Sequence, residues 1–562
     1  MPTIIQGLNL ESEITLIKFK LEGNNTEDIA KLLDEVSSFH PIFIQKYSLT
    51  PTLLSINSRL PFLWRECDEI FKKLSKNEID YKQVRDLLLN QIIAKRIKSM
   101  STIPLLYSAH KKGLETTPAV LEKIVFKTLQ QGYRNVFNRY YVIGCGKGSQ
   151  VTASISSSKD AYFAQNVQRD KWSTNVMIER LGLPIPKWSI IATEKELEKI
   201  FPDYKKPIII KPTGLTGGRG VSVGINSLQE AKKAFRTANN IGPNRAPWQV
   251  KVMIQEQVFG DDYRLLVIDG KLEIVTKRIP AFVEGDGKNT IENLINEINK
   301  NPRRDISNPS HILKPIIIDT PLKELLTQQG LTLDSIPKKG EIVPVREVAS
   351  MSQGGITEDC TDIVGKEIKT IVETLAQSVH AFVLGVDIIC QDISKPLTKE
   401  NGGIIEINTM PESYLNLFPV IGKQREYVSD IYIDRLLAQN NCKQYVLVGQ
   451  LKDDLPTLLR KKKIINNTDT VGEIIEDRYY IDGILINKGL ERWRATEGIK
   501  CNGSLDAIIL HFRDWNEVRE YGLGFDHIHT LFISNEQSKD KKCMKIVRKY
   551  KREKYIDKFK II

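Results

Sequence analysis

The spacing of hydrophobic residues divides the chain into three parts. Residues 1 to about 160 alternate amphipathic helical patterns, such as NTEDIAKLLDEV, with short apolar runs. From residue 160 to about 439, strand and helix patterns are separated by several glycine loops, and beyond residue 440 strand and helix signals alternate again. Helices bring apolar residues together every three or four positions, whereas half-buried strands alternate them. The pattern therefore predicts an α/β fold along the whole chain.

Four segments of the central part give specific predictions. KPIIIKPTGLTGGRGVSVGI indicates a strand ending in Lys211, a Gly/Thr loop and a second strand. SLQEAKKAFRTA is typical of a helix with a serine cap. A hairpin is expected around Asp269-Gly270, because this dipeptide favours a tight turn. FVLGVDIICQD and GGIIEINTMPE predict two further strands.

The length agrees with several domains. At roughly 100–200 residues per domain, 562 residues correspond to about three to five. We predict a multidomain α/β protein with an N-terminal α/β domain over residues 1–160, a central domain over 161–440 and a C-terminal α/β domain over 441–562. No fixed-period repeat or low-complexity linker interrupts this division.

Composition, hydropathy and cysteine content indicate in which cellular compartment the protein is expected. Hydrophobic residues make up 41% and charged residues 27% of the chain, which is typical of globular domains. No run approaches the roughly 18 apolar residues of a membrane helix, and the first 20 residues lack the pattern of a secretory signal. Seven cysteines without a C-x-x-C pair argue against a disulfide framework. We expect a cytoplasmic protein with no membrane partner.

The positive charge is concentrated in one segment. Residues 538–562 hold eleven Lys/Arg and three Asp/Glu, so they supply +8 of the net +12. Ile546, Tyr550, Tyr555 and Phe559 recur there at helix-like spacing, which predicts a solvated basic helix docked by one apolar stripe. We therefore expect no nucleic-acid partner.

A glycine loop between two predicted strands is the first candidate site. Lys211 precedes the loop, which contains Gly217, Gly218 and Gly220. Glycines allow a backbone to approach a polyphosphate and to point N–H groups at it. No Gly-Lys-Ser/Thr opens a helix, so this is not a Walker loop. Taken alone, the loop is also compatible with a flexible turn.

Acidic and amide side chains in two apolar strands form the second candidate site. Asp387 lies in LGVDII, and Glu406 and Asn408 share one face of IIEINTMPE. If the two strands pair, three oxygen donors suited to Mg²⁺ converge. Single acids in strands are often edge or salt-bridge residues, but two carboxylates in such apolar strands are costly to bury without a cation.

Together, the glycine loop and the acidic strands resemble the ATP-grasp superfamily over roughly 280 residues. The resemblance implies that the central domain binds ATP and Mg²⁺. The same resemblance implies that Lys171 and Lys211 are the ATP-binding lysines. It also implies that the hinge that contacts adenine consists of Glu256, Gln257 and Val258. Asp387, Glu406 and Asn408 match the metal ligands.

The segment from Gly285 to Thr361 narrows the resemblance to cyanophycin synthetases, which build a polymer with an aspartate backbone and arginine branches. The matching motifs are Asn301-Pro302-Arg303-Arg304, Thr332 to Pro337 and Ser352-Gln353-Gly354-Gly355. Ser352, Gly354 and Gly355 are therefore candidates for substrate binding, although a plain tight turn explains them equally.

The C-terminal part departs from the two-site members of that family, whose Mur-ligase-like half carries its own phosphate loop. Here the position reads VLVGQLKDDLPTLL: Gly449 is kept, the Lys-Thr/Ser pair is missing, and Asp453 and Asp454 would repel phosphate. The combination is similar to the one-site type, which polymerises preformed β-Asp-Arg dipeptides and keeps a truncated, degenerate Mur-like domain. The expected partners are β-Asp-Arg and a cyanophycin primer, in a homo-oligomer with a dimer favoured.

The implied reaction is ATP-dependent amide ligation through an acyl phosphate at the C-terminal carboxylate of the growing chain. Attack by the dipeptide α-amino group completes it. Arg264 and Arg278 are candidates to stabilise the acyl phosphate, with a surface salt bridge as the alternative for each. Two other functions share many of these residues: an ATP-grasp ligase with a different substrate, and a non-catalytic scaffold.

Overall fold

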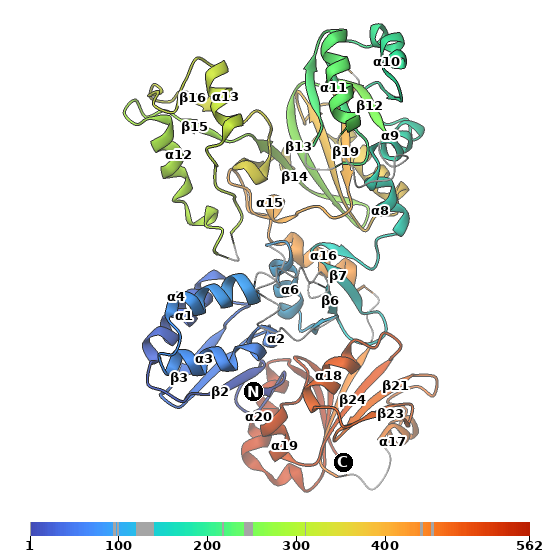
Figure 1. The fold of residues 1–562 in the computed structure, drawn as a ribbon. Coiled ribbons are helices and arrows are strands. Elements are labelled where there is room, and N and C mark those ends of the chain that lie inside the picture. The colour runs from blue at the N-terminus through green and yellow to red at the C-terminus, as the bar shows by residue number, and fades with distance from the viewer. Residues whose placement is uncertain are drawn as a thin grey trace. The chain divides into compact units, whose positions relative to one another are not determined.

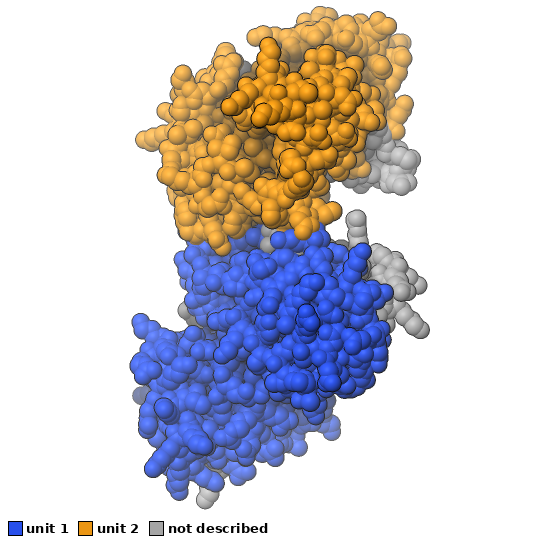
Figure 2. Space-filling view, turned by 90° about the vertical axis from the view of Figure 1, so that its left-hand side faces the viewer, with its two compact units in different colours: residues 1–154, 307–310, 429–562 blue, residues 155–306, 311–428 orange. Residues whose placement is uncertain are grey.

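The computed structural model describes residues 2–562, except residues 94–96, 98–99, 120–139, 216–218, 241–250, 309–310, 399, 439–441 and 451–454. The chain divides into two compact units, shown in two colours in Figure 2. Unit 1 contains residues 1–154, 307–310 and 429–562, and unit 2 contains residues 155–306 and 311–428. Both units combine helices with sheets, so the predicted multidomain α/β class is confirmed. The finer division into three domains stays a prediction.

The N-terminal part of unit 1 has a four-stranded antiparallel sheet. Its order is β1 (Thr3–Ile5), β2 (Leu16–Lys20), β4 (Leu53–Asn57) and β3 (Lys46–Leu49). Helices α1 (Thr26–Phe39) and α3 (Asp68–Ser75) pack against each other and against β3 and β2 (Figure 1). Next along the chain come α4 (Tyr81–Asp86) and α6 (Thr102–Lys111), then the antiparallel strands β5 (Thr116–Pro118), β6 (Tyr140–Ile143) and β7 (Gln150–Ala153).

The C-terminal part of unit 1 is built on a seven-stranded sheet. Five strands run parallel in the order β21 (Val471–Ile475), β24 (Ala507–Phe512), β20 (Lys443–Val448), β25 (Ile528–Ile533) and β26 (Ile556–Ile561). The hairpin of β22 (Arg478–Ile481) and β23 (Ile484–Lys488) extends the β21 edge. Helices α17 (Leu455–Lys461), α18 (Arg492–Lys500), α19 (Trp515–Tyr521) and α20 (Lys541–Arg552) connect the strands.

The two parts of unit 1 share one hydrophobic core. Leu8 and Cys145 are buried in the same cluster as β20, β24 and α20 residues of the C-terminal part. The backbone of Leu8 donates to Phe525 O and accepts from Leu523 N. A buried ion pair also connects the two parts of unit 1, since Lys500 Nζ lies 2.6 Å from Glu115 Oε2. The C-terminal part is thus packed into the N-terminal one.

The prediction for the basic segment was partly wrong. Helix α20 begins after Asp540, whose side chain accepts from Cys543 N, and it ends at Arg552. Tyr550 is buried on its apolar face, but Tyr555 follows the helix and Phe559 lies in β26. Alternation in IDKFKI continues the same apolar spacing, so the pattern alone did not reveal where the helix gives way to a strand.

Unit 2 contains two larger sheets and a small lobe. The first sheet has the order β11 (Ser222–Ile225), β10 (Ile208–Pro212), β12 (Val252–Glu256) and β9 (Trp188–Ile191). Its pairs are antiparallel, and α10 (Glu194–Ile200) and α11 (Leu228–Asn240) pack against it. The second sheet has the order β17 (Ile356–Asp359), β14 (Lys271–Ile279), β13 (Asp261–Ile268), β18 (Val383–Cys390) and β19 (Gly402–Asn408), with α14 (Lys366–Ser378) packed against it.

Unit 2 also contains a small lobe and further helices. The lobe pairs β15 (Phe282–Glu284) with β16 (Ile342–Pro344) and adds α12 (Ile291–Asn299) and α13 (Thr320–Gln328) (Figure 1). Helices α8 (Tyr162–Arg169) and α9 (Lys171–Arg180) precede the first sheet, and α15 (Tyr414–Leu417) follows β19. The predicted hairpin at Asp269-Gly270 is confirmed between β13 and β14, with both residues at positive φ (+49° and +70°).

Candidate active site

Lys211 lies on β10, where strand alternation directs it to the same face as Gln255 of the neighbouring β12. Lys211 is 5% exposed, and its Nζ donates to Gln255 Oε1 at 2.6 Å. Burial, and then the charge of Lys171, lower the pKa of Lys211 to about 8. Sequence analysis missed Gln255, although its place in alternating VMIQE marks it as a polar residue on a buried strand. The pair presents a desolvated ammonium group suited to phosphate.

Lys171 connects the glycine loop with the acidic strand. It is the first residue of α9, whose N-cap Asp170 accepts from Ser173 N at 3.2 Å. Lys171 Nζ donates to Leu215 O at 2.6 Å and lies 3.4 Å from Glu406 Oε1. The two ATP-binding lysines expected from the family resemblance therefore lie near one carboxylate, because Glu406 also acts electrostatically on Lys211.

The two predicted acidic strands do pair. In the antiparallel register of β18 and β19, Asp387 faces Glu406 and Gly385 faces Asn408, with an irregularity between Asp387 and Ile388. Asp387 is buried, Glu406 is partly exposed, and Asn408 Nδ2 is buried without a hydrogen-bond partner among the described residues. The three side chains therefore come from adjoining positions of one sheet, as the alternation predicted.

Two arginines neutralise Asp387. Arg264, opposite it on β13, binds it through Nε and through Nη2 at 3.0 Å, and Arg278 Nη2 lies 3.2 Å from Asp387 Oδ2. Burial alone would raise the pKa of Asp387, but Arg264 and Arg278 lower it below its ordinary value. Arg278 also contacts Asp262 at 2.5 Å. Both arginines are partly buried and belong to a network of ion pairs around a predicted metal ligand.

The residues fit a magnesium nucleotide chemically. Carboxylate and amide oxygens are hard donors of the kind Mg²⁺ takes together with phosphate oxygens. No group of three or more His, Cys, Asp or Glu suited to a metal occurs in the described part of the chain. A metal held here would therefore rely on Asp387, Glu406 and the amide of Asn408, and on substrate oxygens. Their role as ligands stays a prediction.

The hinge residues line a cavity of about 610 Å³. Its walls include Glu256, Gln257, Val258, Trp188 and Gln391. Glu256 Oε1 accepts from Lys205 N at 3.0 Å, and Gln257 Oε1 accepts from Gly224 N at 2.7 Å. The structure thus gives the hinge an adjoining space of small-molecule size. Lys171 and Lys211 are not among the residues that line it.

The glycine loop is described only at its ends. Gly217 and Gly218 lie outside the described residues, whereas Gly220 has a φ of +73°. That value favours glycine, since other residues rarely adopt it. The phosphate-binding role of the three glycines stays a prediction.

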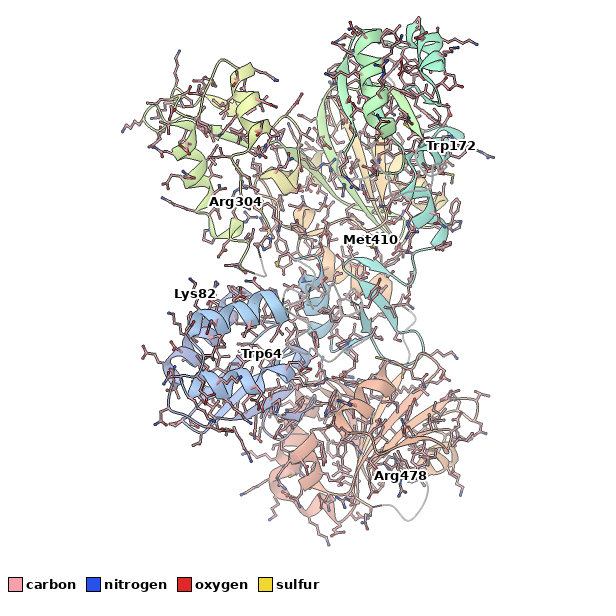
Figure 3. The ribbon with its side chains drawn as sticks, viewed as in Figure 1. Trp64, Lys82, Trp172, Arg304, Met410 and Arg478 are labelled. Carbon is pink, nitrogen blue, oxygen red and sulfur yellow. The ribbon has the colours of Figure 1, made fainter. Side chains whose placement is uncertain are left out.

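The predicted substrate turn packs against the strand that carries Arg278. A Cβ on Gly355 would come within 2.9 Å of Ile279 O, and one on Gly354, at φ +93°, would come within 2.5 Å of the Ile316 side chain. Ser352 Oγ lies 2.9 Å from Ser350 Oγ. Arg304, buried in the lobe of α12 (Figure 3), donates to Gly354 O at 3.0 Å. The turn is held tightly, and its substrate contacts stay a prediction.

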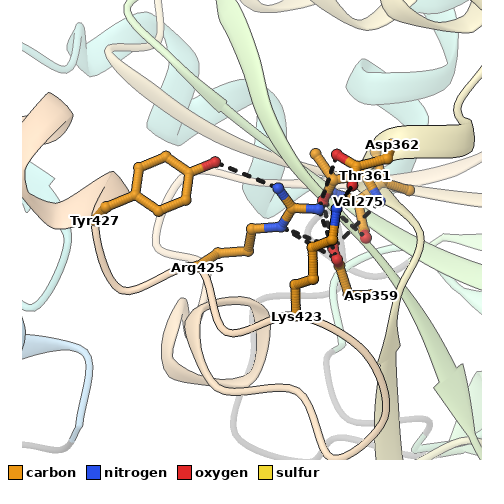
Figure 4. Close-up of polar contacts among 7 residues, drawn as sticks. All are labelled: Val275, Asp359, Thr361, Asp362, Lys423, Arg425 and Tyr427. Carbon is orange, nitrogen blue, oxygen red and sulfur yellow. Dashed lines mark hydrogen bonds and ion pairs between the residues drawn. The ribbon is translucent and has the colours of Figure 1, made fainter.

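Sequence analysis also missed the clamp that fixes the segment after Asn408. Arg425 Nη2 binds Asp359 at 2.7 Å and Asp362 at 2.9 Å (Figure 4). On the same segment Asn416 Nδ2 donates to Thr276 Oγ1 at 2.7 Å and to Arg264 O at 3.3 Å. Asn416 thus holds this segment against the two strands that carry Arg264 and Arg278, and Arg425 holds it against the end of β17 and the residues that follow. These residues are brought together by the pairing of distant strands, which no local sequence pattern encodes.

The sequence of the chain is similar to those of several known proteins. The chain is 32% identical over 361 residues to a cyanophycin synthetase of Geminocystis herdmanii, covering 64% of this chain and 40% of that protein. A cyanophycin synthetase of Crocosphaera subtropica is 33% identical over 398 residues, covering 70% and 45%. Over these regions the chain is similar to cyanophycin synthetases. The predicted resemblance is confirmed, while the matched region spans less than half the length of these relatives.

Other comparisons are less specific. The glutathione biosynthesis bifunctional protein of Listeria innocua is 32% identical over 294 residues, covering 51% of this chain and 36% of that protein. A bifunctional glutathione synthetase structure from Pasteurella multocida has a TM-score of 0.47 at 23% identity, covering 66% of this chain and 47% of that one. No family model matches the chain. None of the described helices is long and apolar enough to cross a membrane.

Proposed function

We propose that this chain is an ATP-dependent amide ligase that polymerises β-Asp-Arg dipeptides into cyanophycin. The observation that carries the proposal is the shared environment of Lys171, Lys211 and Glu406, which connects the predicted phosphate lysines with the predicted metal strand. Similarity to cyanophycin synthetases supports the substrate class. We expect ATP and Mg²⁺ as cofactors and a homo-oligomeric, cytoplasmic enzyme.

The chemistry needs an activated carboxylate, because forming an amide from a free carboxylate in water is uphill. ATP with Mg²⁺, when bound, supplies the phosphoryl group that makes the C-terminal carboxylate of the growing chain an electrophile. Lys171 and Lys211 would orient the phosphates as point charges. Arg264 and Arg278 lie beside the buried Asp387, where their guanidinium groups would stabilise oxyanions of the acyl phosphate.

The second half of the reaction is attack by the dipeptide α-amino group. The nitrogen lone pair forms the amide bond, the acyl–oxygen bond to phosphate breaks, and the amine proton leaves to solvent. The turn of Ser352, Gly354 and Gly355 packs next to the Arg278 strand and would hold the chain terminus. Closing the site against water would protect the acyl phosphate from hydrolysis.

The C-terminal part supports a one-site enzyme. Gly449, the remnant of the phosphate loop, has its Cα facing Ser534, where a Cβ would come within 2.2 Å of Oγ. The close approach of Ser534 therefore explains the glycine at this position, and no bound nucleotide is needed to explain it. Asp453 and Asp454 lie outside the described residues. If arginine is already attached to each incoming unit, only one kind of amide bond has to be made, and one ATP site suffices.

Substrate choice provides the test. The protein would receive ATP, Mg²⁺ and a cyanophycin primer with either β-Asp-Arg or free Asp plus Arg, and phosphate release and polymer length would be followed. We expect both signals with the dipeptide alone. Turnover with free Asp plus Arg would contradict the one-site assignment. Phosphate release with other acceptors only would favour a different ligase, as the similarity to glutathione biosynthesis proteins allows, and no release at all would favour a scaffold.

A further inference from the structure

Thr409, directly after β19, is fixed by residues outside the predicted site. It is buried, although the next residue, Met410, is exposed (Figure 3). Its backbone N–H donates to Gln168 Oε1 at 3.0 Å, and its hydroxyl donates to the same oxygen. Its C=O accepts from Ser156 Oγ at 2.7 Å. Every polar group of Thr409 thus has a protein partner, as a buried residue requires.

A third residue from the same stretch of chain fixes the neighbouring strand. Asp160 is buried, and its Oδ1 accepts from Val383 N at 3.0 Å. Val383 is the first residue of β18, and antiparallel pairing places the start of β18 beside the end of β19. Ser156, Asp160 and Gln168, here called the brace, all belong to unit 2. The brace therefore holds the same end of both strands that carry predicted metal ligands.

The brace acts on the peptide bond that joins Asn408 to Thr409. Because Gln168 binds the N–H of this bond, the peptide plane cannot rotate without breaking a buried hydrogen bond. The side chain of Asn408 has little anchorage of its own, since its Nδ2 is buried without a hydrogen-bond partner among the described residues. The amide of this predicted ligand is therefore oriented through its neighbour.

The position of Gln168 on α8 suits this role. The buried residues of the helix are Ala164 and Val167, which pack in one core with residues of β18 and β19. Gln168 lies four residues after Ala164 and shares that side of the helix, where a polar side chain is costly without a partner. Its amide oxygen accepts from both donors of Thr409 and brings no charge of its own to the metal strands.

We propose that Gln168 is a positioning residue for the predicted metal site and acts through Thr409 on the orientation of Asn408. The inference rests on the proposed function, because it concerns the Mg²⁺ that the ligase would use. Gln168 is not itself a ligand in this arrangement, since its oxygen is already bound by Thr409. Removing a partner that orients a metal ligand typically weakens metal binding about 10- to 100-fold.

Metal affinity of the full-length protein tests this role. Electron paramagnetic resonance measures the binding of Mn²⁺, as a substitute for Mg²⁺, to the protein with ADP. In Gln168→Met both donors of Thr409 lose their acceptor, so Mn²⁺ binding should weaken about tenfold or more. Gln168→Glu keeps an acceptor and should restore the affinity, and Ser156→Ala should weaken binding in the same direction. Gln165→Met, the same substitution on the same helix, is the matched control and should bind as the parent does.

Hydrogen exchange gives a readout that needs no metal. The amide of Thr409 should exchange faster in Gln168→Met than in the parent, whereas the amide of Val383, which Asp160 holds, should be unchanged.

The outcomes separate this inference from the proposed function. Equal Mn²⁺ affinity in the parent and in Gln168→Met, even with a lowered unfolding midpoint, would show a structural role alone and would overturn the inference. So would weakened binding that Gln168→Glu does not restore or that Gln165→Met shares. A parent protein that binds no Mn²⁺ with ADP would overturn the proposed function as well.

Discussion

Asp387 and Glu406 face each other across β18 and β19, yet each is held by different cations. Arg264 and Arg278 bind Asp387, whereas Lys171 lies 3.4 Å from Glu406. The two acids therefore occupy facing positions of one sheet, and each contacts its own basic side chains. These basic side chains offset the cost of placing two acids in such apolar strands, and a divalent cation held by Asp387 and Glu406 would add to that positive charge.

Replacing Glu406 with Gln should separate chemistry from folding. The amide keeps the shape of the side chain but removes the charge that faces Lys171. We expect ligation to fall at least about 100-fold, as when one group stabilising transition-state charge is lost, with the unfolding midpoint little changed. Phosphate release and thermal unfolding measure the two effects. Glu367→Gln on the exposed side of α14 is the control, and full activity of Glu406→Gln would remove Glu406 from the site.

Arg278 should be required for stability as well as activity. Its removal leaves Asp262 and Asp387 buried with one fewer cation, so the variant Arg278→Gln should lose about 3 kcal/mol of unfolding free energy at pH 7. The loss should shrink between pH 7 and pH 4, because burial raises the pKa of Asp262 and this carboxyl takes up a proton as the pH falls. Urea unfolding at both pH values measures it. An equal loss at pH 7 and 4 would contradict the electrostatic origin.

Nucleotide affinity should depend on the charge of Lys211. With its pKa near 8, this side chain loses its proton as the pH rises through 8. Bound phosphate favours the ammonium form, so the affinity for ATP should fall above pH 8 and be nearly constant below about 7. Fluorescence titration with a labelled ATP analogue across this range measures it. In Lys211→Arg the guanidinium stays charged, so its affinity should lack this step; an identical step there would assign the titration to another group.

Two glycine substitutions distinguish a clash from backbone strain. Gly354 and Gly340 have φ values of +93° and +81°, but a Cβ meets Ile316 only at Gly354, while the space at Gly340 is open. Gly354→Ala should therefore cost about 1–3 kcal/mol more than Gly340→Ala. It should also raise the KM for the primer if the turn binds the chain terminus. Chemical unfolding and primer titration report these two quantities, and equal stability losses would argue against the close approach.

The buried pair of Lys500 and Glu115 should stabilise unit 1. In Lys500→Met the carboxylate of Glu115 is left buried without its cation, which should cost about 3–5 kcal/mol. Adding Glu115→Gln to that variant should recover part of the loss. Lys300→Met removes an exposed partner of Glu297 and should leave the unfolding midpoint unchanged. A wild-type midpoint for Lys500→Met would contradict the role of the C-terminal part as architecture.

Much of the central site was predictable from alternation within single strands. Period-two spacing placed Glu406 and Asn408 on one face, and the buried run LGVDII marked Asp387 as an acid in an apolar strand. The expected hairpin at Asp269-Gly270 and the capped helix α11 also form, with Ser227 Oγ accepting from Glu230 N. These features depend on local geometry, which can be recognised from the spacing of residues along the sequence.

Relations between distant strands were not predictable. The pairing of Arg264 with Asp387 follows from the neighbouring positions of β13 and β18, which are separated by more than 100 residues. The contact of Lys211 with Gln255 depends in the same way on β10 lying beside β12. The burial of Leu8 in a core built around β20 and β24 gives no local signal at all. Tertiary pairing decided these contacts.

The shared core of unit 1 has a consequence for biosynthesis. The backbone partners of Leu8, Leu523 and Phe525, are made more than 500 residues after it. At about 5–20 residues per second, Leu8 must wait on the order of a minute before these partners exist. Unit 2 is complete well before then. A chaperone that shields the nascent N-terminal sheet would therefore raise the yield of this protein more than one that acts on the finished chain.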